Sequence, residues 1–467
     1  MCVSKSKDSK GVLSQMSVKN WKIEGIPAYT RGETDEKLVV LGGGLNEGFA
    51  KALEDESLMH IVRRTSELDF IEYCKELESA GFVCDYSNDE PFGLFREFVA
   101  DGKLVYAYFM KRAGEARIIL DRSSCSYAEF VGINSDPDTR EDTELMQYGL
   151  YYADPIKGIA STCGMLYVIR TRNNKLFLVD GGEGAQCTNE SFNELIRLLR
   201  EMTGTTEGEQ LTINCWFSTH PHNDHMDYFV NFMRKYHDFV KVERILFNFP
   251  RPENMDIPAE MMDKFVNKYL NGVMGELRTY CPDARYMKAH TGQKFDLGGG
   301  LIAQVLQTHE DLAYDHPEGK YIAGTNTTSS LLKLTFEDKS LIILGDCEED
   351  NGRILRKYYL PEEVECYYLQ AAHHLANKIE NIYSYIKADT VLIPQGRMRI
   401  HRIRREHYGI LCKYYDRDKF HLEGDYTVHF RVAQGGEEEI TYFPVAGGPF
   451  CPARDIDNLW LVRHEFE

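Results

Sequence analysis

The strongest constraint on the fold comes from a short polar segment in the middle of the chain. The apolar run 213–217 is followed directly by Ser-Thr-His-Pro-His-Asn-Asp-His at 218–225. A strand that ends in such a loop delivers its side chains to a sheet edge, and imidazole and carboxylate groups suit zinc and its first-row neighbours. Three histidines and one aspartate within 220–225 cannot all serve one tetrahedral ion without further help. We therefore expect two adjacent metals, completed by residues far downstream.

Several later segments repeat the pattern of a short apolar strand that ends in a ligand-type side chain. They are 301–306 before His309, 341–344 before Asp346, and 367–370 before His373 and His374. Converging strand ends are what a shared metal centre requires. The alternative is a surface group of histidines at the start of a helix, which the density of ligand-type residues in 220–225 disfavours.

From about residue 158 to 395 the chain resembles the metallo-β-lactamase fold hydrolases. The matching motifs are Val179 to Gly182, the H-x-H-x-D-H of 220–225, the turn 344–346 and the pair His373-His374. The stretch 326–331, together with the double histidine, looks most like the hydrolase domain of competence-type DNA-internalisation proteins. The resemblance implies an α/β chain folded as a four-layer αβ/βα sandwich. It also implies two divalent metals between the sheets, usually zinc, with manganese or iron as alternatives.

The resemblance also implies roles for individual residues. His220 and His222 would bind the first metal, Asp224 and His225 the second, and Asp346 would bridge both. A bridging carboxylate and neutral imidazoles leave the metals enough charge to acidify a shared water. The expected chemistry is attack by a metal-bridged hydroxide, oriented by Asp224 or Asp346, on an ester, amide or phosphoester.

The paired histidines leave two assignments open. His373 or His374 would complete the second metal site, and the other would protonate the leaving group or hydrogen-bond an oxyanion. Relatives with a double histidine usually follow it with glycine, whereas Leu375 stands here. That difference could reshape the pocket behind the second metal.

A second departure concerns the third histidine motif of the family. The Gly-rich H-x-x-G-H turn that usually carries it does not occur in this sequence. His309 is the best-placed substitute as a metal ligand, with a surface or supporting position as the alternative. His290 and His316 are poorer candidates because loop-like polar sequence surrounds them.

A basic stretch follows the predicted strand that ends at Pro394. Residues 397–405 contain five arginines, which is unusual in an otherwise acidic chain. If strand ends converge on the metals, Arg399 and Arg402 lie near the site and could hold phosphate oxygens bidentately. Asn326 is a further candidate for contact with substrate. The alternative, a charged loop that pairs with local acids such as Asp416 and Asp418, is favoured over the functional interpretation.

The order of the predicted helices and strands divides the chain into an α+β appendage at 1–150 and a hydrolase domain at 151–467. The appendage should contain an amphipathic helix from Leu68 to Gly81 and strands at 94–99, 104–110 and 116–120. It carries no group of ligand-type residues. A role in gating substrate, dimerisation or partner binding is therefore expected there, and the oligomeric state is left open.

Composition narrows the partners and the compartment. A formal net charge of −19 disfavours extended nucleic acid and anionic membrane surfaces as partners. The 12 cysteines are scattered without a C-x-x-C pair, which fits a reducing compartment. The first residues lack the apolar segment of a signal peptide, and no apolar run is long enough to span a bilayer, so a cytoplasmic location is expected.

Three functional hypotheses follow from these features. The leading one is a binuclear metal-dependent hydrolase, with a phosphoester-type substrate favoured over other small-molecule esters. A di-iron redox enzyme would use nearly the same ligands, but nothing in the sequence supplies a flavin domain. A non-catalytic, metal-stabilised binding module is disfavoured because the set of ligands is nearly complete.

Overall fold

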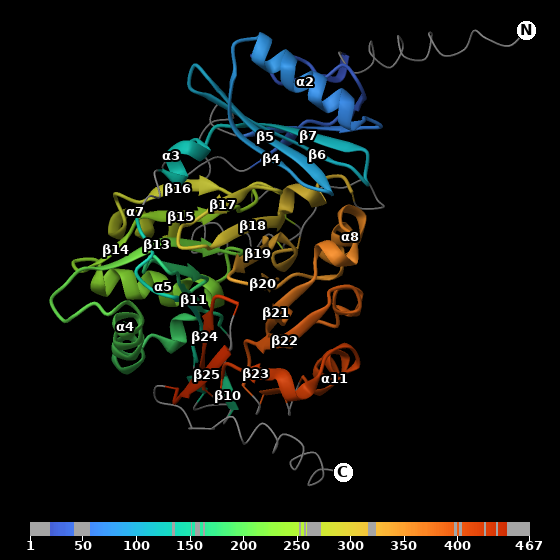
Figure 1. Cartoon of the computed structure of the whole chain (residues 1–467). Coiled ribbons are helices and arrows are strands. Elements are labelled where there is room, and N and C mark those ends of the chain that lie inside the picture. Colours follow the sequence, from blue (N-terminus) through green and yellow to red (C-terminus); the bar gives the residue numbers. More distant parts are fainter. Residues whose placement is uncertain are drawn as a thin grey trace, which may run out of the picture.

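The computed structural model shows two stacked β-sheets with helices on their outer faces and a smaller α+β unit above them (Figure 1). It describes residues 19–41, 57–132, 136–150, 152–154, 159–161, 164–251, 254–255, 258, 272–315, 324–396, 399–400, 404–424, 426–435 and 438–445. The predicted α/β class and four-layer αβ/βα sandwich are confirmed. Within these ranges, no helix has the length and apolar character needed to cross a membrane.

The first sheet of the sandwich is nine-stranded and runs in the order β16-β15-β13-β12-β11-β8-β24-β25, with β14 beside β13. Its strands are β8 (Asp142–Gln147), β11 (Tyr167–Arg170), β12 (Leu176–Val179), β13 (Leu211–Ser218), β14 (Val240–Val242), β15 (Arg244–Phe247), β16 (Arg285–Lys288), β24 (Thr427–Ala433) and β25 (Glu438–Phe443). The strands β12, β13, β15 and β16 are parallel, so their carboxyl ends reach the same edge.

The second sheet is seven-stranded and runs in sequence order from β17 to β23. Its strands are β17 (Lys294–Asp296), β18 (Ile302–Gln307), β19 (Leu331–Phe336), β20 (Lys339–Ile343), β21 (Cys366–Gln370), β22 (Ala388–Ile393) and β23 (Phe420–Leu422). The last four strands are parallel to one another. A separate pair, β9 (Tyr152–Asp154) and β10 (Ile159–Ser161), is antiparallel.

Alternating side chains on β13 show how the layers are held together. Phe217 points between the sheets, into the core that also contains Ile343 and Leu369 of the second sheet. Trp216 points the other way and stacks on Phe229 of α5 (Asn223–Tyr236), with ring centroids 4.5 Å apart. The outer helices are α4 (Asn189–Thr203), α5 and α7 (Met274–Tyr280) on one side, and α8 (Glu349–Tyr358), α9 (Glu380–Tyr383) and α11 (Arg405–Tyr414) on the other (Figure 1).

The N-terminal unit is a seven-stranded antiparallel sheet with one long helix against it (Figure 1). Its strands are β1 (Glu33–Thr34), β2 (Val39–Val40), β3 (Leu58–Arg63), β4 (Val83–Asp89), β5 (Gly93–Ala100), β6 (Lys103–Met110) and β7 (Glu115–Asp121). The predicted helix is present as α2 (Glu67–Ser79), which begins at a capping box between Ser66 and Asp69 and buries Phe70 and Leu77. The predicted strands correspond to β5, β6 and β7.

The short segment after β7 connects this unit to the sandwich. It contains α3 (Tyr127–Val131), and β8 then enters the first sheet of the sandwich between β11 and β24. This strand lies before the boundary predicted at residue 150. That division of the chain into 1–150 and 151–467 stays a prediction, while the strand pairing assigns 142–147 to the sandwich.

A buried ionic network joins the N-terminal unit to the sandwich. His290, which follows β16, places Nε2 at 3.1 Å from Asp121 Oδ2 of β7 and Nδ1 at 2.9 Å from Glu310 Oε1. Tyr106 of β6 stacks on the His290 ring, with centroids 4.8 Å apart. Burial by itself would lower the pKa of His290, but Glu310 and Asp121 outweigh it and raise the pKa to about 10. The imidazolium therefore carries the charge that two buried carboxylates need.

We expect this network to make stability depend on pH in a defined window. Because the pKa of His290 is raised from 6.5 to about 10, its stabilisation is complete below pH 6.5 and is lost as the pH rises toward 10. The free energy of unfolding of the wild type should fall by up to about 1.4 kcal/mol per pH unit in that window. His290→Gln should show a flatter decline in denaturant titrations. Equal slopes for both proteins would contradict the assignment.

Candidate metal centre

The candidate centre lies where parallel strands of both sheets end. In the first sheet, β12 leads to Asp180 and β13 to the 218–225 segment, whose last part forms the first turn of α5. In the second sheet, β20 leads to Asp346 and β21 leads to His373 and His374. The sequence pattern of apolar strands that end in ligand-type residues thus corresponds to a shared edge between the two sheets.

A tight contact between two turns places Asp346 at the centre of this edge. Gly345, just before it, has φ +57°, a left-handed conformation that favours glycine. A Cβ at this position would lie 3.0 Å from Ser329 Oγ and from the Thr219 side chain. The Ser329 hydroxyl also accepts the Asp346 backbone N–H at 3.0 Å. Close packing of the two sheets at this point therefore requires glycine.

One group of ligand-type side chains gathers around Asp346 Oδ1. His225 Nε2 lies 3.1 Å and His374 Nε2 lies 3.5 Å from this oxygen. The two ring nitrogens are 3.2 Å apart, and Asp224 Oδ2 is 3.5 Å from His374 Nε2. Ligand atoms held about 2.0–2.1 Å from one tetrahedral ion lie about 3.3 Å from each other. The spacing of these four side chains is therefore that of ligands around a shared ion.

A second group faces the other oxygen of the same carboxylate. His220, His222 and Asp346 bring potential ligand atoms within 4.8 Å of one another. His220 Nε2 lies 3.8 Å from Asp346 Oδ2, and His373 Nε2 approaches the same oxygen at 3.6 Å. His220 Nε2 is buried without a hydrogen-bond partner, as expected for an atom that serves as a ligand. Imidazole and carboxylate donors in both groups fit zinc, manganese or iron as divalent ions.

The two histidines of the late pair reach different oxygens because of their backbone conformation. His373, His374 and Leu375 have φ values of 48°, 45° and 56°, three successive left-handed residues. Each costs about 1–2 kcal/mol for a residue other than glycine. The rings are consequently splayed, with centroids 6.4 Å apart and planes at 70°. Leu375 is fully buried in the core and adopts the left-handed conformation nonetheless.

Buried groups behind the ligands fix their orientation. Asp180 Oδ2 lies 2.7 Å from His225 Nδ1, and the same carboxylate accepts the backbone N–H and hydroxyl of Thr219. His374 Nδ1 lies 3.0 Å from the Pro394 carbonyl oxygen. These contacts place the proton on Nδ1 of both rings and leave Nε2 toward the centre, which is the usual arrangement behind metal-binding histidines.

Burial and mutual repulsion set the pKa values of the centre without metal. Burial, with repulsion from neighbouring imidazoles, holds the pKa of His220 well below its usual value. Burial alone would also lower the pKa of His225, but Asp346 and Asp180 raise it well above the usual value. Burial would raise the pKa of Asp346, whereas His225, His374 and His373 lower it strongly. The centre thus holds Asp346 as a carboxylate beside a protonated His225, while His220 stays neutral.

His309 lies outside both groups. Its Nε2 is 2.9 Å from Asn248 Oδ1, and Asn248 Nδ2 in turn donates to Glu310 at 2.9 Å. Burial lowers the pKa of His309 to about 4. The side chain therefore borders the His290 network instead of Asp346. His316, the other poorer candidate, lies outside the described residues.

The predicted substrate residues differ in how well the structure places them. Asn326 Nδ2 lies 3.4 Å from His373 Nε2, directly beside the centre. Arg399 begins a helical turn, and its backbone N–H donates to Gly396 at 3.1 Å. Arg404, from the same basic stretch, donates to the carbonyl oxygen of Ala376 at 3.4 Å. Among the described residues of the stretch, Arg404 therefore contacts the backbone just after His374 and Leu375. Arg402 lies outside the described residues.

A cavity between the start of α8 and the segment 376–379 has carboxylates in its lining, together with Lys378 and His407, and was not predicted from the sequence. Glu348, Glu349 and Asp350 contribute carboxylates to it, and Asn377 donates to Glu348 at 2.8 Å. Glu348 also lies 3.5 Å from Asn326 Nδ2. The Asp346-Cys347-Glu348 order could have indicated this position, because residues just after a ligand at a strand end remain near the site.

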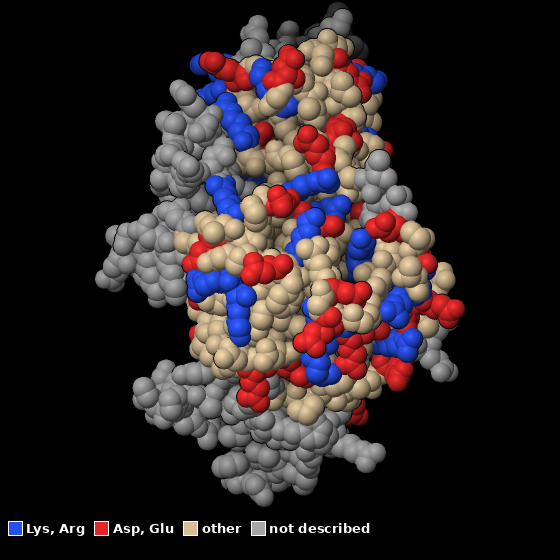
Figure 2. Space-filling view, turned by 90° about the vertical axis from the view of Figure 1, so that its left-hand side faces the viewer, with Lys and Arg blue, Asp and Glu red and all other residues tan. Residues whose placement is uncertain are grey.

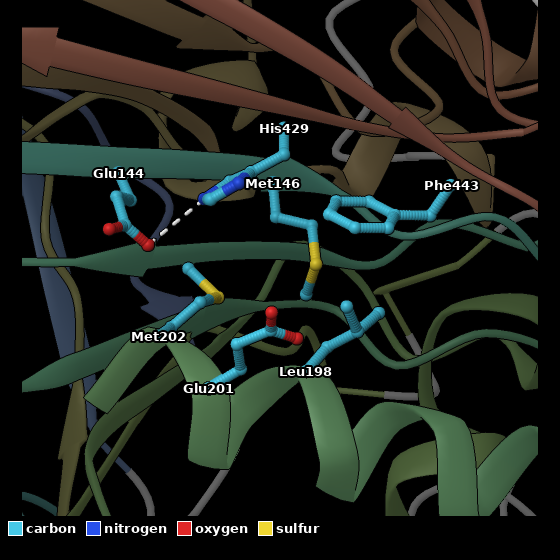
Figure 3. A pocket seen from close by; sticks show the side chains of 7 residues that line it. All are labelled: Glu144, Met146, Leu198, Glu201, Met202, His429 and Phe443. Carbon is cyan, nitrogen blue, oxygen red and sulfur yellow. Dashed lines mark hydrogen bonds and ion pairs between the residues drawn. The ribbon is translucent and has the colours of Figure 1, made fainter. Parts of the chain in front are cut away.

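The molecular surface also bears a second pocket and charged side chains of both signs. This pocket, between α4 and the strands β8, β24 and β25, has Met146, Met202 and Phe443 in its lining, and its His429 pairs with Glu144 at 3.0 Å (Figure 3). It contains none of the predicted site residues. On the face shown in Figure 2, described Lys and Arg side chains are interspersed with Asp and Glu and form no continuous basic field.

Comparison with known proteins gives a distant likeness in fold. No protein-family model matches the sequence, and no curated protein matches it. Among solved structures, the chain is similar to the metallo-β-lactamase fold protein YhfI from Bacillus subtilis, with 13% identity, 65% of this chain and 100% of that chain covered, and a TM-score of 0.34. It is also similar to Zn²⁺-bound PqqB from Methylobacterium extorquens, with 8% identity, 60% of this chain and 97% of that chain covered, and a TM-score of 0.36. A third similar structure is human tRNase Z, short form, with 16% identity, 49% of this chain and 76% of that chain covered, and a TM-score of 0.26. Because these identities and TM-scores are low, the candidate metal centre is assigned from contacts within this chain alone.

Asp180 provides a test of the centre that leaves the ligands themselves intact. Asp180→Asn should weaken zinc binding by about 10–100-fold, because the amide no longer fixes the His225 ring with its charge. Competition with a chromogenic chelator measures the change. Glu201→Gln, on the exposed face of α4, serves as the matched control and should bind zinc as the wild type does. Unchanged affinity in Asp180→Asn would contradict the proposed orientation of His225.

Proposed function

We propose that the protein is a binuclear metal-dependent hydrolase. The observation that carries this proposal is the position of Asp346, whose two oxygens face two separate groups of histidines. A carboxylate shared in this way suits a bridge between two ions. The first site would use His220 and His222, and the second would use Asp224, His225 and His374.

The proposed reaction divides between the ions and the side chains around them. Two divalent ions at these positions would acidify a water and polarise the bond under attack. Asp224, which is partly exposed and therefore accessible to substrate, would accept a hydrogen bond from that water. Asn326, beside His373, would donate its amide N–H to the substrate. The buried walls of the centre would exclude bulk water and strengthen these contacts.

We further propose that both histidines of the late pair are ligands. His374 belongs to the second site, while His373 approaches the Asp346 oxygen on the side of His220. His373 would then replace the missing third histidine motif, and His309, turned toward Asn248, would not be a ligand. This assignment differs from the sequence-based expectation that only one of the pair binds metal.

The proposed substrate is a small phosphoester or a related ester. Arg404 of the basic stretch contacts the Ala376 backbone close to His374, and arginines of this stretch would bind a phosphate, whereas carboxylates line the cavity that Glu348 borders. A compact substrate with one anionic group fits this combination better than an extended polyanion, which the carboxylates would repel. The closer likeness to competence-type hydrolase domains stays a prediction.

Replacement of Asp346 tests the two-metal proposal. The wild type should bind two zinc ions per chain, and Asp346→Ala should lose both and all hydrolysis, because the bridge contributes to each site. Elemental analysis and a panel of phosphodiester, lactone and thioester substrates measure these changes. Asp238→Ala, at an exposed position just after α5, is the matched control. Full loading and activity in Asp346→Ala would exclude the proposal, and iron with visible absorbance in the wild type would favour redox chemistry instead.

Single histidine variants test the ligand assignment. His373→Ala should retain about one metal per chain because only the first site loses a ligand, and His309→Ala should retain both. Cobalt substitution followed by visible absorption reports coordination independently of activity. If His309→Ala loses one ion and His373→Ala keeps two, the roles of these residues are reversed.

The basic stretch allows a test of substrate charge. The double replacement Arg399→Ala with Arg402→Ala should raise the KM for a phosphodiester about 100-fold or more, because charge-assisted hydrogen bonds to phosphate contribute about 1.5–3 kcal/mol each. The KM for a neutral ester should change little. Lys413→Ala, an exposed residue paired with Glu380, provides the control for net charge. Equal effects on both substrates would remove the proposed phosphate contact.

A further inference from the structure

Three polar side chains meet between the two sheets, behind the metal centre. Gln147 ends β8 and Tyr167 begins β11, and the two residues are direct partners across the antiparallel pair, so their side chains share one face. Glu423 follows β23 of the opposite sheet. All three are buried, with exposed fractions of 0% or 1%. Polar groups in such a position need partners inside the protein.

The hydrogen bonds of these residues account for only part of their polar atoms. Gln147 Nε2 donates to the Ile393 carbonyl oxygen at 3.1 Å and to Glu423 Oε2 at 3.4 Å. Three atoms are left without a partner, namely Glu423 Oε1, Gln147 Oε1 and the Tyr167 hydroxyl. The amide and the carboxyl group are in contact, Tyr167 stands beside Gln147 on the same face, and Glu423 acts electrostatically on the Tyr167 hydroxyl. Buried polar atoms of a native protein are rarely left unpaired unless water satisfies them.

We propose that Glu423, Gln147 and Tyr167 hold one internal water molecule, and that Glu423 is a neutral carboxylic acid that donates to it. Each of the three protein atoms then has a hydrogen-bond partner. Glu423 Oε2 accepts from the Gln147 amide, while the Oε1–H group and the Tyr167 hydroxyl donate to the water. The water donates to Gln147 Oε1, which gives it three partners, the usual number for a buried water.

The surroundings support a neutral acid over a carboxylate. Burial raises the pKa of Glu423 well above its usual value, and Asp180 adds repulsion, while Gln147 and His225 act in the opposite direction but do not reverse the shift. Tyr167, the other titratable group facing it, has its pKa raised well above the usual value by burial and by Glu423 itself. The alternative occupant is a monovalent cation, which would take the three oxygens as ligands and require an ionised Glu423.

The water site lies directly behind the support of the second metal site. Tyr167 pairs with Val179, the residue before Asp180, and Asp180 holds the ring of His225. A neutral Glu423 leaves Asp180 as the negative group on this side of His225. The water therefore fills the space behind the Asp180–His225 pair without adding charge to it.

Infrared spectroscopy of the full chain tests the protonation of Glu423. The difference spectrum between wild type and Glu423→Gln at neutral pH should show the carbonyl stretch of a protonated carboxylic acid, lost in the variant and shifted in D₂O. In case Glu423→Gln does not fold, ¹³C-glutamate labelling assigns the band to a glutamate, and its persistence in Glu97→Gln separates it from Glu97, whose pKa burial raises to about 7. Absence of the band in wild-type protein would overturn the proposal.

Two further measurements identify the occupant. Tyr167→Phe removes one donor to the water and should shift the Glu423 carbonyl band, so an unchanged band would overturn the proposed geometry. The melting temperature of the wild type should be the same in sodium, potassium and choline salts, and a fall in choline would assign the site to a cation instead. All spectra are recorded with and without zinc, so that failure of the two-metal proposal leaves this result interpretable.

Discussion

A carboxylate buried between two sheets has to be compensated by positive charge, and Asp346 is such a group. Its environment supplies imidazoles, but burial and mutual repulsion hold the pKa values of His220, His222 and His374 below the usual value, which leaves His225 as the main source of proton-borne charge. That single compensation is modest for a site with two carboxylates at its centre and a third, Asp180, behind it. Divalent cations would resolve this imbalance, and the spacing of ligand-type atoms around Asp346 Oδ1 matches what such an ion requires. The fold supplies the site by bringing parallel strands of two sheets to one edge.

The parts of the fold that the sequence predicts well are those encoded by local pattern. The strand before 218–225 follows from the apolar run 213–217, and it carries His220, His222, Asp224 and His225 to one place. Asp346 and the late histidine pair are also predictable, since each follows a strand. The role of His309 was not predictable by the same argument, because a strand end fixes the edge that a residue reaches but not the neighbour it faces. Asn248, distant in sequence, is the partner that turns His309 away.

Features that depend on contacts between segments far apart in the chain could not be predicted from the sequence. Nothing in the local pattern around His290 shows that Asp121 and Glu310 flank it, because the three come from separate elements of two structural units. The strand β8 was likewise counted with the appendage, since a short amphipathic run does not reveal which sheet it joins. The same holds for Glu423 and Tyr167, whose meeting depends on how closely the two sheets pack. These arrangements depend on which groups are buried together, and local secondary-structure propensity does not determine that.

The left-handed run at 373–375 has a consequence for how the centre fills. His373 and His374 are adjacent in the main chain, and their rings diverge only while three residues stay in an unfavourable conformation. If both rings bind metal as proposed, an ion on one ring would help to hold this conformation and would preorganise the neighbouring ring for the other ion. The two proposed sites would then be coupled through a single peptide bond. By thermodynamic linkage, occupation of one site would raise the affinity of the other.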